Sequence, residues 1–559
     1  MLLLKELAHI LHSPNEDIVY LNHQINYKNQ LKVKVKTYIN KMSVIKKALE
    51  SASTANTSLI KPDAKTWNGD NAYSTTTDPR LDLFFSGFVR GCSENKLNSM
   101  MKLSWAKYPE DTVKLIIHSR DCRSGKGEKK VSYQGMLWLR KYKPLTYIMN
   151  LPTFLNYGCF KDLLQLAAFS QDLKLNPLGC EGHYLELELI AEFLADDMDK
   201  FNRGEKSLSL AAKWAPSEGK YFDKQYGFAS DIAGILFPNY NEKDSLKKYR
   251  TTLTSLRKHL NVVETLITSN KWNEIEYSHV PAKAHRLLRK AFLKHCPEEY
   301  RQYLDNLIKG KVKINITGTH PHDLVREYLN NRNNLDETIE GQWKALVEDT
   351  RSKGLLKNTI AISDVSGSMT GTPMEVSIAL GILIAQCCEG TFGNKIITFS
   401  QNPQVQALKG DNLQQLVSFT KNMEWGMNTD LDKVFGLLLN IAKLNDVSEE
   451  NMIKNIVIIS DMQFDSAVGS TLTTFQRNRK LFEDAGYKLP NIVFWNVNGA
   501  ITSIPVQTHE SGSILISGFS AELLKDLIKN GFDCDPIGFL LSVISKYDVA
   551  IDEYESTVI

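Results

Sequence analysis

The apolar residues of this chain follow one spacing before about Leu356 and another after it. From Asp82 to about Leu346, apolar side chains recur three and four positions apart, as on one face of an amphipathic helix. Segments with this pattern include LDLFFSGFVRG, ENKLNSMMKLSWAKY, EDTVKLIIHSRD, YQGMLWLRKY, DLLQLAAFS, LELELIAEFLADDMDKF and AHRLLRKAFLKH. Short helices joined by short turns predict an all-helical N-terminal domain of stacked helical pairs, a HEAT-like solenoid, although we find no exact repeat period.

After Leu356, short β-rich runs alternate with amphipathic helices. We expect strands over residues 358–363, 394–400, 455–460 and 491–497, with helices between them. Such alternation predicts a mostly parallel, doubly wound, Rossmann-like sheet with helices on both faces. Ligands of such sheets bind at the carboxyl ends of the strands.

The length indicates more than one domain. Single hydrophobic cores stop growing at roughly 250–300 residues, and this chain has 559. We predict a helical extension with a polar linker over residues 1–69, a helical-repeat domain over 70–350 and an α/β domain over 351–559. The linker is inferred from SASTANTS and WNGDNAYSTTTDPR, which are rich in Ser, Thr, Asn and Asp.

The composition is that of an ordinary globular protein, with 42% hydrophobic and 23% charged residues. The apolar run at the amino end is broken by Lys5 and Glu6, and no signal-peptide cleavage site follows it. No apolar stretch approaches the ~20 residues that cross a bilayer. The eight cysteines include no C-x-x-C pair. We therefore expect reduced thiols, a cytoplasmic location and no membrane partner.

The net charge of +3 conceals an uneven distribution along the chain. From residue 358 onward there are 13 Lys and Arg against 23 Asp and Glu, a net charge of −10. The preceding residues carry 54 basic and 41 acidic side chains, a net charge of +13. This division predicts that the basic part could bind a polyanion and the acidic part a cation.

Oxygen-bearing side chains follow the ends of two predicted strands. Asp364, Ser366 and Ser368 alternate directly after the first strand, and Asp461 ends the strand NIVIIS. Thr429 stands in the loop GMNTDL just before a helix. Because the carboxyl ends of parallel strands meet at one edge of a sheet, we expect all five side chains to converge there. Mg²⁺ prefers oxygen ligands of this kind, so the sequence predicts a site for Mg²⁺ or another divalent cation such as Mn²⁺.

This ordered set resembles the metal-ion-dependent adhesion site of von Willebrand factor A domains. The resemblance covers about 200 residues and all five motif positions. It implies that Asp364, Ser366, Ser368 and Thr429 touch the metal directly or through water, and that Asp461 acts through a water. It further implies a sixth coordination position open to a carboxylate, a phosphate or water. The alternative is that these are ordinary turn residues at strand ends.

A second resemblance covers most of the chain. The segments NAYSTTTDPRLDLFFSGFVRG, IHSRDCRSGKGEKK and YGCFKDLL, together with SDMQFD downstream, are similar to the uncharacterised family called domain of unknown function 2828. This similarity extends over roughly residues 70–530, and no activity is established for that family. A helical-repeat module joined to a metal domain also resembles, in architecture alone, the Ro (TROVE) ribonucleoprotein, which binds small RNAs. RNA is therefore an expected partner by analogy.

A glycine-containing basic segment precedes a predicted helix. Its basic residues are Arg120, Arg123, Lys126, Lys129 and Lys130. Such a loop can hold phosphate through backbone N–H groups and basic side chains, so these five are our candidate nucleic-acid-binding residues. The segment is not a Walker A loop, because G-x-x-x-x-G-K-[ST] is absent. The alternative is a solvated basic turn.

Three functional hypotheses remain open. The first is a non-enzymatic, metal-dependent binding protein whose basic helical domain engages RNA. The second is a protein–protein scaffold that uses the metal to bind an acidic residue of a partner, without nucleic acid. The third, a metal-dependent hydrolase, has less support, because the sequence shows no general base paired with the predicted site.

Overall fold

Several helices of the amino-terminal half begin at residues that favour helix starts. A computed structural model describes residues 61–175, 184–330, 334–399, 403–423, 429–465, 470–500 and 503–557. The helices predicted before residue 60 lie outside these ranges. Ser93 caps α4 through its side chain, and a proline opens both α5 and α7. None of the described helices is both long enough and apolar enough to span a lipid bilayer.

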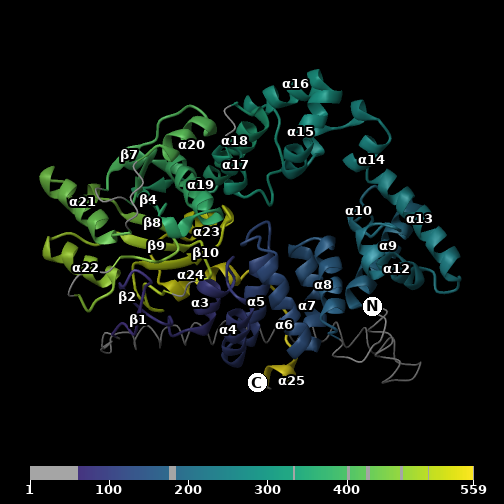
Figure 1. Ribbon diagram of the computed structural model, residues 1–559, viewed down its shortest axis with the longest axis horizontal. Coiled ribbons are helices and arrows are strands. Elements are labelled where there is room, and N and C mark those ends of the chain that lie inside the picture. Colours follow the sequence, from purple (N-terminus) through teal and green to yellow (C-terminus); the bar gives the residue numbers. More distant parts are fainter. Residues whose placement is uncertain are drawn as a thin grey trace. The chain divides into compact units, whose positions relative to one another are not determined.

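The prediction of helices from the apolar spacing is confirmed in nearly every segment of the helical part (Figure 1). Neighbouring helices contact one another in chain order from α4 to α9. The α-helices are α3 (Pro79–Asp82), α4 (Glu94–Lys107), α5 (Pro109–Arg120), α6 (Lys130–Tyr142), α7 (Pro144–Tyr157), α8 (Phe160–Asp172), α9 (Leu185–Asn202), α10 (Ala211–Trp214), α11 (Tyr221–Tyr226), α12 (Phe228–Leu236), α13 (Glu242–His259), α14 (Val263–Thr268), α15 (Ala282–His295), α16 (Pro297–Ile308), α17 (Pro321–Leu329) and α18 (Glu337–Arg351).

The segment LDLFFSGFVRG differs from the prediction of a regular helix. The first two residues of this segment end the α-helix α3. The next residues, η1 (Leu83–Gly87), form a π-helical turn. Phe88 N–H donates to Leu83 O, which is the wider bond of a π turn. Two short 3₁₀ turns, η2 (Trp272–Glu274) and η3 (Tyr277–His279), lie between α14 and α15.

The carboxyl-terminal half contains a six-stranded sheet in the order β10-β9-β8-β4-β6-β7. All neighbouring strands are parallel except β6 and β7, so the expected parallel sheet has one antiparallel edge. The strands are β4 (Thr359–Ser363), β6 (Lys395–Thr398), β7 (Val405–Ala407), β8 (Asn455–Ser460), β9 (Asn491–Asn496) and β10 (Ser513–Ser517). Two smaller two-stranded sheets pair β1 (Ala64–Lys65) with β2 (Asn71–Ala72) and β3 (Leu356–Lys357) with β5 (Cys388–Glu389).

Helices alternate with these strands, as the pattern predicted. Helix α19 packs against β4, β6 and β8, and α24 packs against β10. The helices are α19 (Thr372–Cys387), α20 (Leu413–Lys421), α21 (Leu431–Leu444), α22 (Thr474–Asp484), α23 (Glu522–Asn530), α24 (Pro536–Ile544) and α25 (Glu553–Thr557), with 3₁₀ turns η4 (Gly367–Met369), η5 (Gly390–Phe392) and η6 (Glu449–Asn451).

The strand order creates a switch point between β4 and β8. The chain runs from β4 to β6 on one side of β4 and then returns to place β8 on its other side. Loops at the carboxyl ends of β4 and β8 therefore leave the sheet in opposite directions. The crevice between such loops is where open α/β sheets bind ligands.

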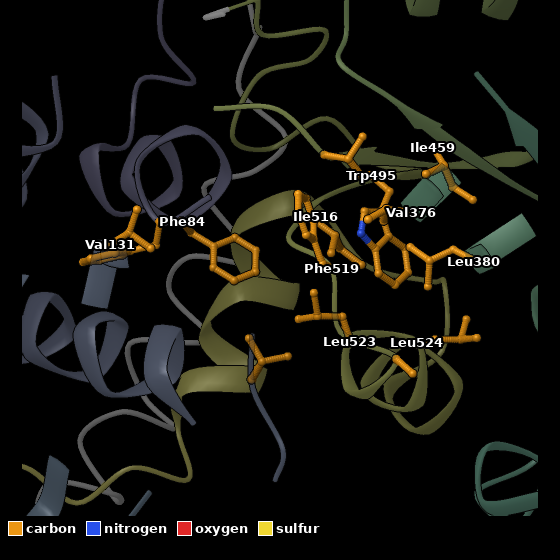
Figure 2. Close-up of a cluster of buried hydrophobic side chains, with 14 of the residues drawn as sticks. Phe84, Val131, Val376, Leu380, Ile459, Trp495, Ile516, Phe519, Leu523 and Leu524 are labelled. Carbon is orange, nitrogen blue, oxygen red and sulfur yellow. The ribbon is translucent and has the colours of Figure 1, made fainter. Parts of the chain in front are cut away.

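Most of the helical part shares a hydrophobic core with the α/β part, and buried residues between Val263 and Ile314 form a second cluster; residues 62–559 form one compact unit. Figure 2 shows Phe84 and Val131 of the helical part in the same cluster as Trp495 and Ile516 of the sheet. Both ends of the helical part pack on the α/β part, through η1 against β10 and through α17 against α19. The predicted boundary at residue 69 falls inside the β1–β2 hairpin.

Candidate metal centre

Two neighbouring strands bring Asp364 and Asp461 to the same edge of the sheet. In the register of β4 and β8, Ser363 lies opposite Ile459. Asp364 follows β4, and its backbone N–H donates to Ile459 O at 3.0 Å. Asp461 comes directly after Ser460, the last residue of β8. Both carboxylates therefore stand at the switch point that the strand order creates.

Ser366 and Ser368 form a polar network with these carboxylates. Asp364 accepts the Ser366 N–H through Oδ1 at 2.9 Å and the Ser460 hydroxyl through Oδ2 at 2.6 Å. The hydroxyl oxygens of Ser366 and Ser368 lie 3.0 Å apart, and the Ser368 hydroxyl is near enough to the Asp461 carboxylate to lower its pKa. Ser366 is buried, whereas Ser368 is exposed and opens the network to solvent. Hydrogen bonds thus connect three of the five predicted metal-binding residues, and Asp461 lies beside them.

The two carboxylates are poorly compensated by the protein. Burial raises the pKa of Asp364 to about 6. The hydrogen bond from Ser460 lowers this pKa, whereas the charge of Asp461 raises it. Burial also raises the pKa of Asp461, and the hydrogen bond from Ser368 partly offsets this effect. None of the groups that shift either pKa is a cation. Two buried carboxylates whose pKa values are shifted by no cation among the described residues favour a bound cation.

One carboxylate oxygen of Asp461 stands without a partner in the described part of the chain. Its Oδ1 accepts the Gln463 N–H at 3.2 Å, but its buried Oδ2 has no hydrogen-bond partner among the described residues. Between them, Met462 has a φ of 65°, a left-handed conformation that costs a non-glycine residue about 1–3 kcal/mol. An unsatisfied buried carboxylate oxygen is also costly. Carboxylate and hydroxyl oxygens at this edge fit a hard divalent cation such as Mg²⁺.

Thr429 lies against the segment that follows Asp461. Its buried hydroxyl is 2.8 Å from Gln463 O, 2.9 Å from Asp465 Oδ1 and 3.1 Å from Asn68 Nδ2. Its backbone N–H donates to Asp465 Oδ2 at 2.9 Å. Within the described ranges, no hydrogen bond joins Thr429 to the other four predicted ligands. The structure therefore connects Thr429 to the site through Gln463.

The site depends on hydroxyls as well as carboxylates. Across the residues that the structure describes, no group of three or more His, Cys, Asp or Glu side chains is placed to hold a metal ion by itself. A cation at the switch point would take two carboxylates, supplemented by serine and threonine hydroxyls and by water. This is the oxygen-rich, partly hydrated environment that Mg²⁺ accepts.

Three residues of this edge were not predicted from the sequence: Asn68, Gln463 and Asp465. Asp465 holds both the backbone and the hydroxyl of Thr429, and Asn68 reaches Thr429 from a segment that reads as a linker. SDMQFD contains Gln463 and Asp465, but in the sequence it served only as part of a family resemblance. The Asn-Gly pair of WNGD signals a turn, yet not what the turn contacts.

The five basic residues predicted to bind nucleic acid do not form one surface. Arg120 and Lys126 are buried, whereas Arg123, Lys129 and Lys130 are exposed. The sequence could not reveal this division, because a run of basic residues ordinarily lies in solvent. Only the three exposed residues remain available to a phosphate.

The two buried cations have internal partners. Arg120 pairs with Asp162 at 2.8 Å, with side chains that are 3% and 1% exposed. The ammonium group of Lys126 donates to the carbonyl oxygens of Phe84 and Phe88 and to the Ser517 hydroxyl, which joins η1 to β10. Burial lowers the pKa of Lys126 well below its usual value. Both side chains are therefore engaged within the fold rather than at its surface.

Comparison with known proteins now assigns the chain to a family. Residues 66–179 and 183–356 match the family described as Domain of unknown function (DUF2828), and residues 358–537 match Domain of unknown function (DUF7788). The resemblance predicted over roughly residues 70–530 thus divides between two descriptions, close to the start of β4. The chain belongs to the DUF2828 family.

A viral relative extends over nearly the same length. The chain is 33% identical over 509 residues to "Uncharacterized protein L728" of Acanthamoeba polyphaga mimivirus, covering 86% of this chain and 87% of that protein. The similarity spans both the helical and the α/β parts. Neither the family descriptions nor this relative's name states an activity.

Proposed function

We propose that this protein is a non-enzymatic binding protein whose α/β part is a von Willebrand factor A-like domain with a site for Mg²⁺ or Mn²⁺. Asp364, Ser366, Ser368, Thr429 and Asp461 would supply the ligands, directly or through water. The strand order, with one antiparallel edge and the motif at the switch point, supports this assignment. When bound, the cation would supply a Lewis-acidic position that a partner's anionic group can occupy.

One observation carries the proposal. The Asp461 Oδ2 atom is buried without a hydrogen-bond partner in the described part of the chain, beside the second buried carboxylate, Asp364. A protein that folds without a cation here pays for the burial of two like charges. A divalent cation would satisfy the orphaned oxygen and neutralise both charges.

The partner that we favour is a protein with an accessible carboxylate. The α/β part carries a net charge of −10 from residue 358 onward, so a polyanion would meet repulsion there. A single acidic residue on an otherwise basic surface would combine metal coordination with charge complementarity. The helical part, which we infer to be a HEAT-like solenoid, would offer a second surface.

Calorimetric titration with Mg²⁺ tests the metal site. Asp364→Ala should abolish binding, because it removes a ligand at the centre of the network. Asp411→Ala is the matched control, since it removes an exposed carboxylate of the same part with the same change in charge. The proposal fails if the wild-type protein does not bind Mg²⁺, or if Asp364→Ala binds it as well as Asp411→Ala does.

RNA remains a second candidate because the chain before residue 358 has a net charge of +13. Arg123, Lys129 and Lys130 are its exposed candidates. Binding of single-stranded or structured RNA should weaken steeply as the salt concentration rises. The Lys129→Ala variant should bind RNA more weakly than the wild-type protein at the same salt concentration. Absence of binding to both RNA probes at low salt would eliminate this candidate.

A further inference from the structure

The β1–β2 hairpin lies on the segment that follows Asp461. Thr66 Oγ1 donates to Phe464 O at 2.7 Å, the Trp67 N–H donates to the Gln463 side chain, and Gly69 forms a backbone bridge with Asp465. Trp67 is 88% exposed, so its indole does not hold the turn in place. Polar contacts thus hold the turn against residues 463–465.

The Asn68 amide joins this turn directly to a predicted metal ligand. Its Nδ2 lies 3.1 Å from Thr429 Oγ1 and 2.8 Å from Gln463 O. A carbonyl oxygen can only accept, so the amide atom beside Gln463 O must be the nitrogen. Both N–H groups of Asn68 are thereby used, one on the hydroxyl of Thr429 and one on the carbonyl of Gln463.

These contacts determine what the Thr429 hydroxyl can do. A hydroxyl has one proton and two lone pairs. The proton is directed to Gln463 O or to Asp465 Oδ1, and both of these oxygens accept hydrogen bonds. One lone pair accepts from Asn68. A single lone pair remains for a cation, and its direction is fixed by the other partners.

We propose that Asn68 is a positioning residue of the metal site, supplied by the hairpin that precedes the helical part. This inference rests on the proposed function. Asn68 does not bind the cation; it orients the Thr429 hydroxyl and so sets the geometry of that ligand. Removal of the hydrogen-bond partners of metal ligands typically weakens metal binding 10–100-fold.

The same hairpin offers a matched control for simple anchoring. Asn71 Nδ2 donates to Ser470 O at 2.9 Å and to Leu472 O at 3.0 Å. Asn71 thus makes two hydrogen bonds from the same kind of side chain to carbonyl oxygens farther along the chain after Asp461, but none to Thr429. If the hairpin only fastened this segment, Asn68→Ala and Asn71→Ala would have equal effects.

The test measures the affinities of the full-length variants for Mg²⁺ and Ca²⁺ by calorimetry, with thermal denaturation in parallel. Asn68→Ala should weaken Mg²⁺ binding by about tenfold, and Asn71→Ala by less than about twofold. Asn68→Ala should weaken Ca²⁺ binding less than Mg²⁺ binding, because Ca²⁺ tolerates irregular ligand geometry and Mg²⁺ does not. Both variants should lower the melting temperature by similar amounts.

The inference is overturned if Asn68→Ala binds Mg²⁺ like the wild type, if both asparagine variants lose affinity equally, or if Mg²⁺ and Ca²⁺ binding fall equally. These results leave the proposed function intact, provided that Asp364→Ala still abolishes binding. A wild-type protein that binds no Mg²⁺ overturns both proposals.

Discussion

Replacement of Arg120 by alanine should destabilise the fold strongly and leave a buried charge behind. Asp162 receives two contacts from Arg120, from Nε and from the second guanidinium nitrogen, each at 2.8 Å. Its other partners are the Tyr133 hydroxyl at 2.6 Å and the Cys159 N–H at 2.8 Å. Arg120→Ala therefore removes two of these four contacts to Asp162. It also removes the positive charge among these partners that balances the carboxylate.

The expected loss follows from the burial of the pair. Each hydrogen bond to a charged group contributes about 1.5–3 kcal/mol, and removal of one partner from a buried ion pair costs about 3–5 kcal/mol. We predict a fall of about 3–5 kcal/mol in the free energy of unfolding of Arg120→Ala, measured by urea denaturation. Lys130→Ala, at an exposed position of the same basic segment, should change it by about 0.5 kcal/mol or less.

A double-mutant cycle separates the ion pair from general damage. Asp162→Ala should cost less in the Arg120→Ala background than in the wild type, because the orphaned carboxylate is then absent. The reasoning is refuted if Arg120→Ala loses less than about 1 kcal/mol, or if the two losses are additive. Weaker RNA binding by a fully stable Arg120→Ala variant would indicate instead that Arg120 acts at the surface.

Three further predictions concern the metal site, the carboxyl-terminal helix and pH. Asp461→Asn should raise the melting temperature of the protein in chelator, because it removes one of two like charges, and should weaken Mg²⁺ binding; a lower melting temperature would contradict this. Glu555→Ala should lower the free energy of unfolding by about 1–2 kcal/mol in urea denaturation, because Glu555 accepts two backbone N–H groups in the first turn of α7. Glu553→Ala, at an exposed position, is the control, and equal losses in the two variants would refute the capping role. Burial lowers the pKa of His285 to about 4, so the unfolded chain binds more protons than the folded chain below pH 6.5. The free energy of unfolding should therefore fall as the pH is lowered from 6.5 to 4. His285→Gln should reduce this dependence on pH in urea titrations, and an unchanged dependence would contradict the prediction.

Much of the fold could be predicted from the sequence because local apolar patterns dominate it. The fully buried β8 and β9 read as apolar runs, and α19 follows β4 as the alternation required. The short edge strand β7 and the π turn η1 were not predicted. Neither has a periodic signal of its own, since β7 has three residues and η1 occurs within a run of ordinary helical spacing.

The candidate site was predictable where it is local in sequence. Asp364, Ser366 and Ser368 occur together, and the ends of β4 and β8 place them beside Asp461. The contact between Asn68 and Thr429 joins residues 361 positions apart, and no local pattern encodes such a pairing.

The structural role of the basic segment was also hidden from the sequence. In the sequence, nothing distinguishes Lys126 from its exposed basic neighbours, but in the structure η1 and β10 enclose it. Burial is decided by tertiary packing, and composition alone favoured the opposite reading for this side chain.

The most direct test of the central claim is a crystal structure of the full-length protein with Mn²⁺, with the cation located by anomalous diffraction. The proposal predicts an anomalous peak at the carboxyl ends of β4 and β8, within coordination distance, directly or through one water, of Asp364, Ser366, Ser368, Thr429 and Asp461. It also predicts that the Asp461 Oδ2 atom faces the cation or a water bound to it. A peak elsewhere, or no peak at saturating Mn²⁺, would contradict the metal site.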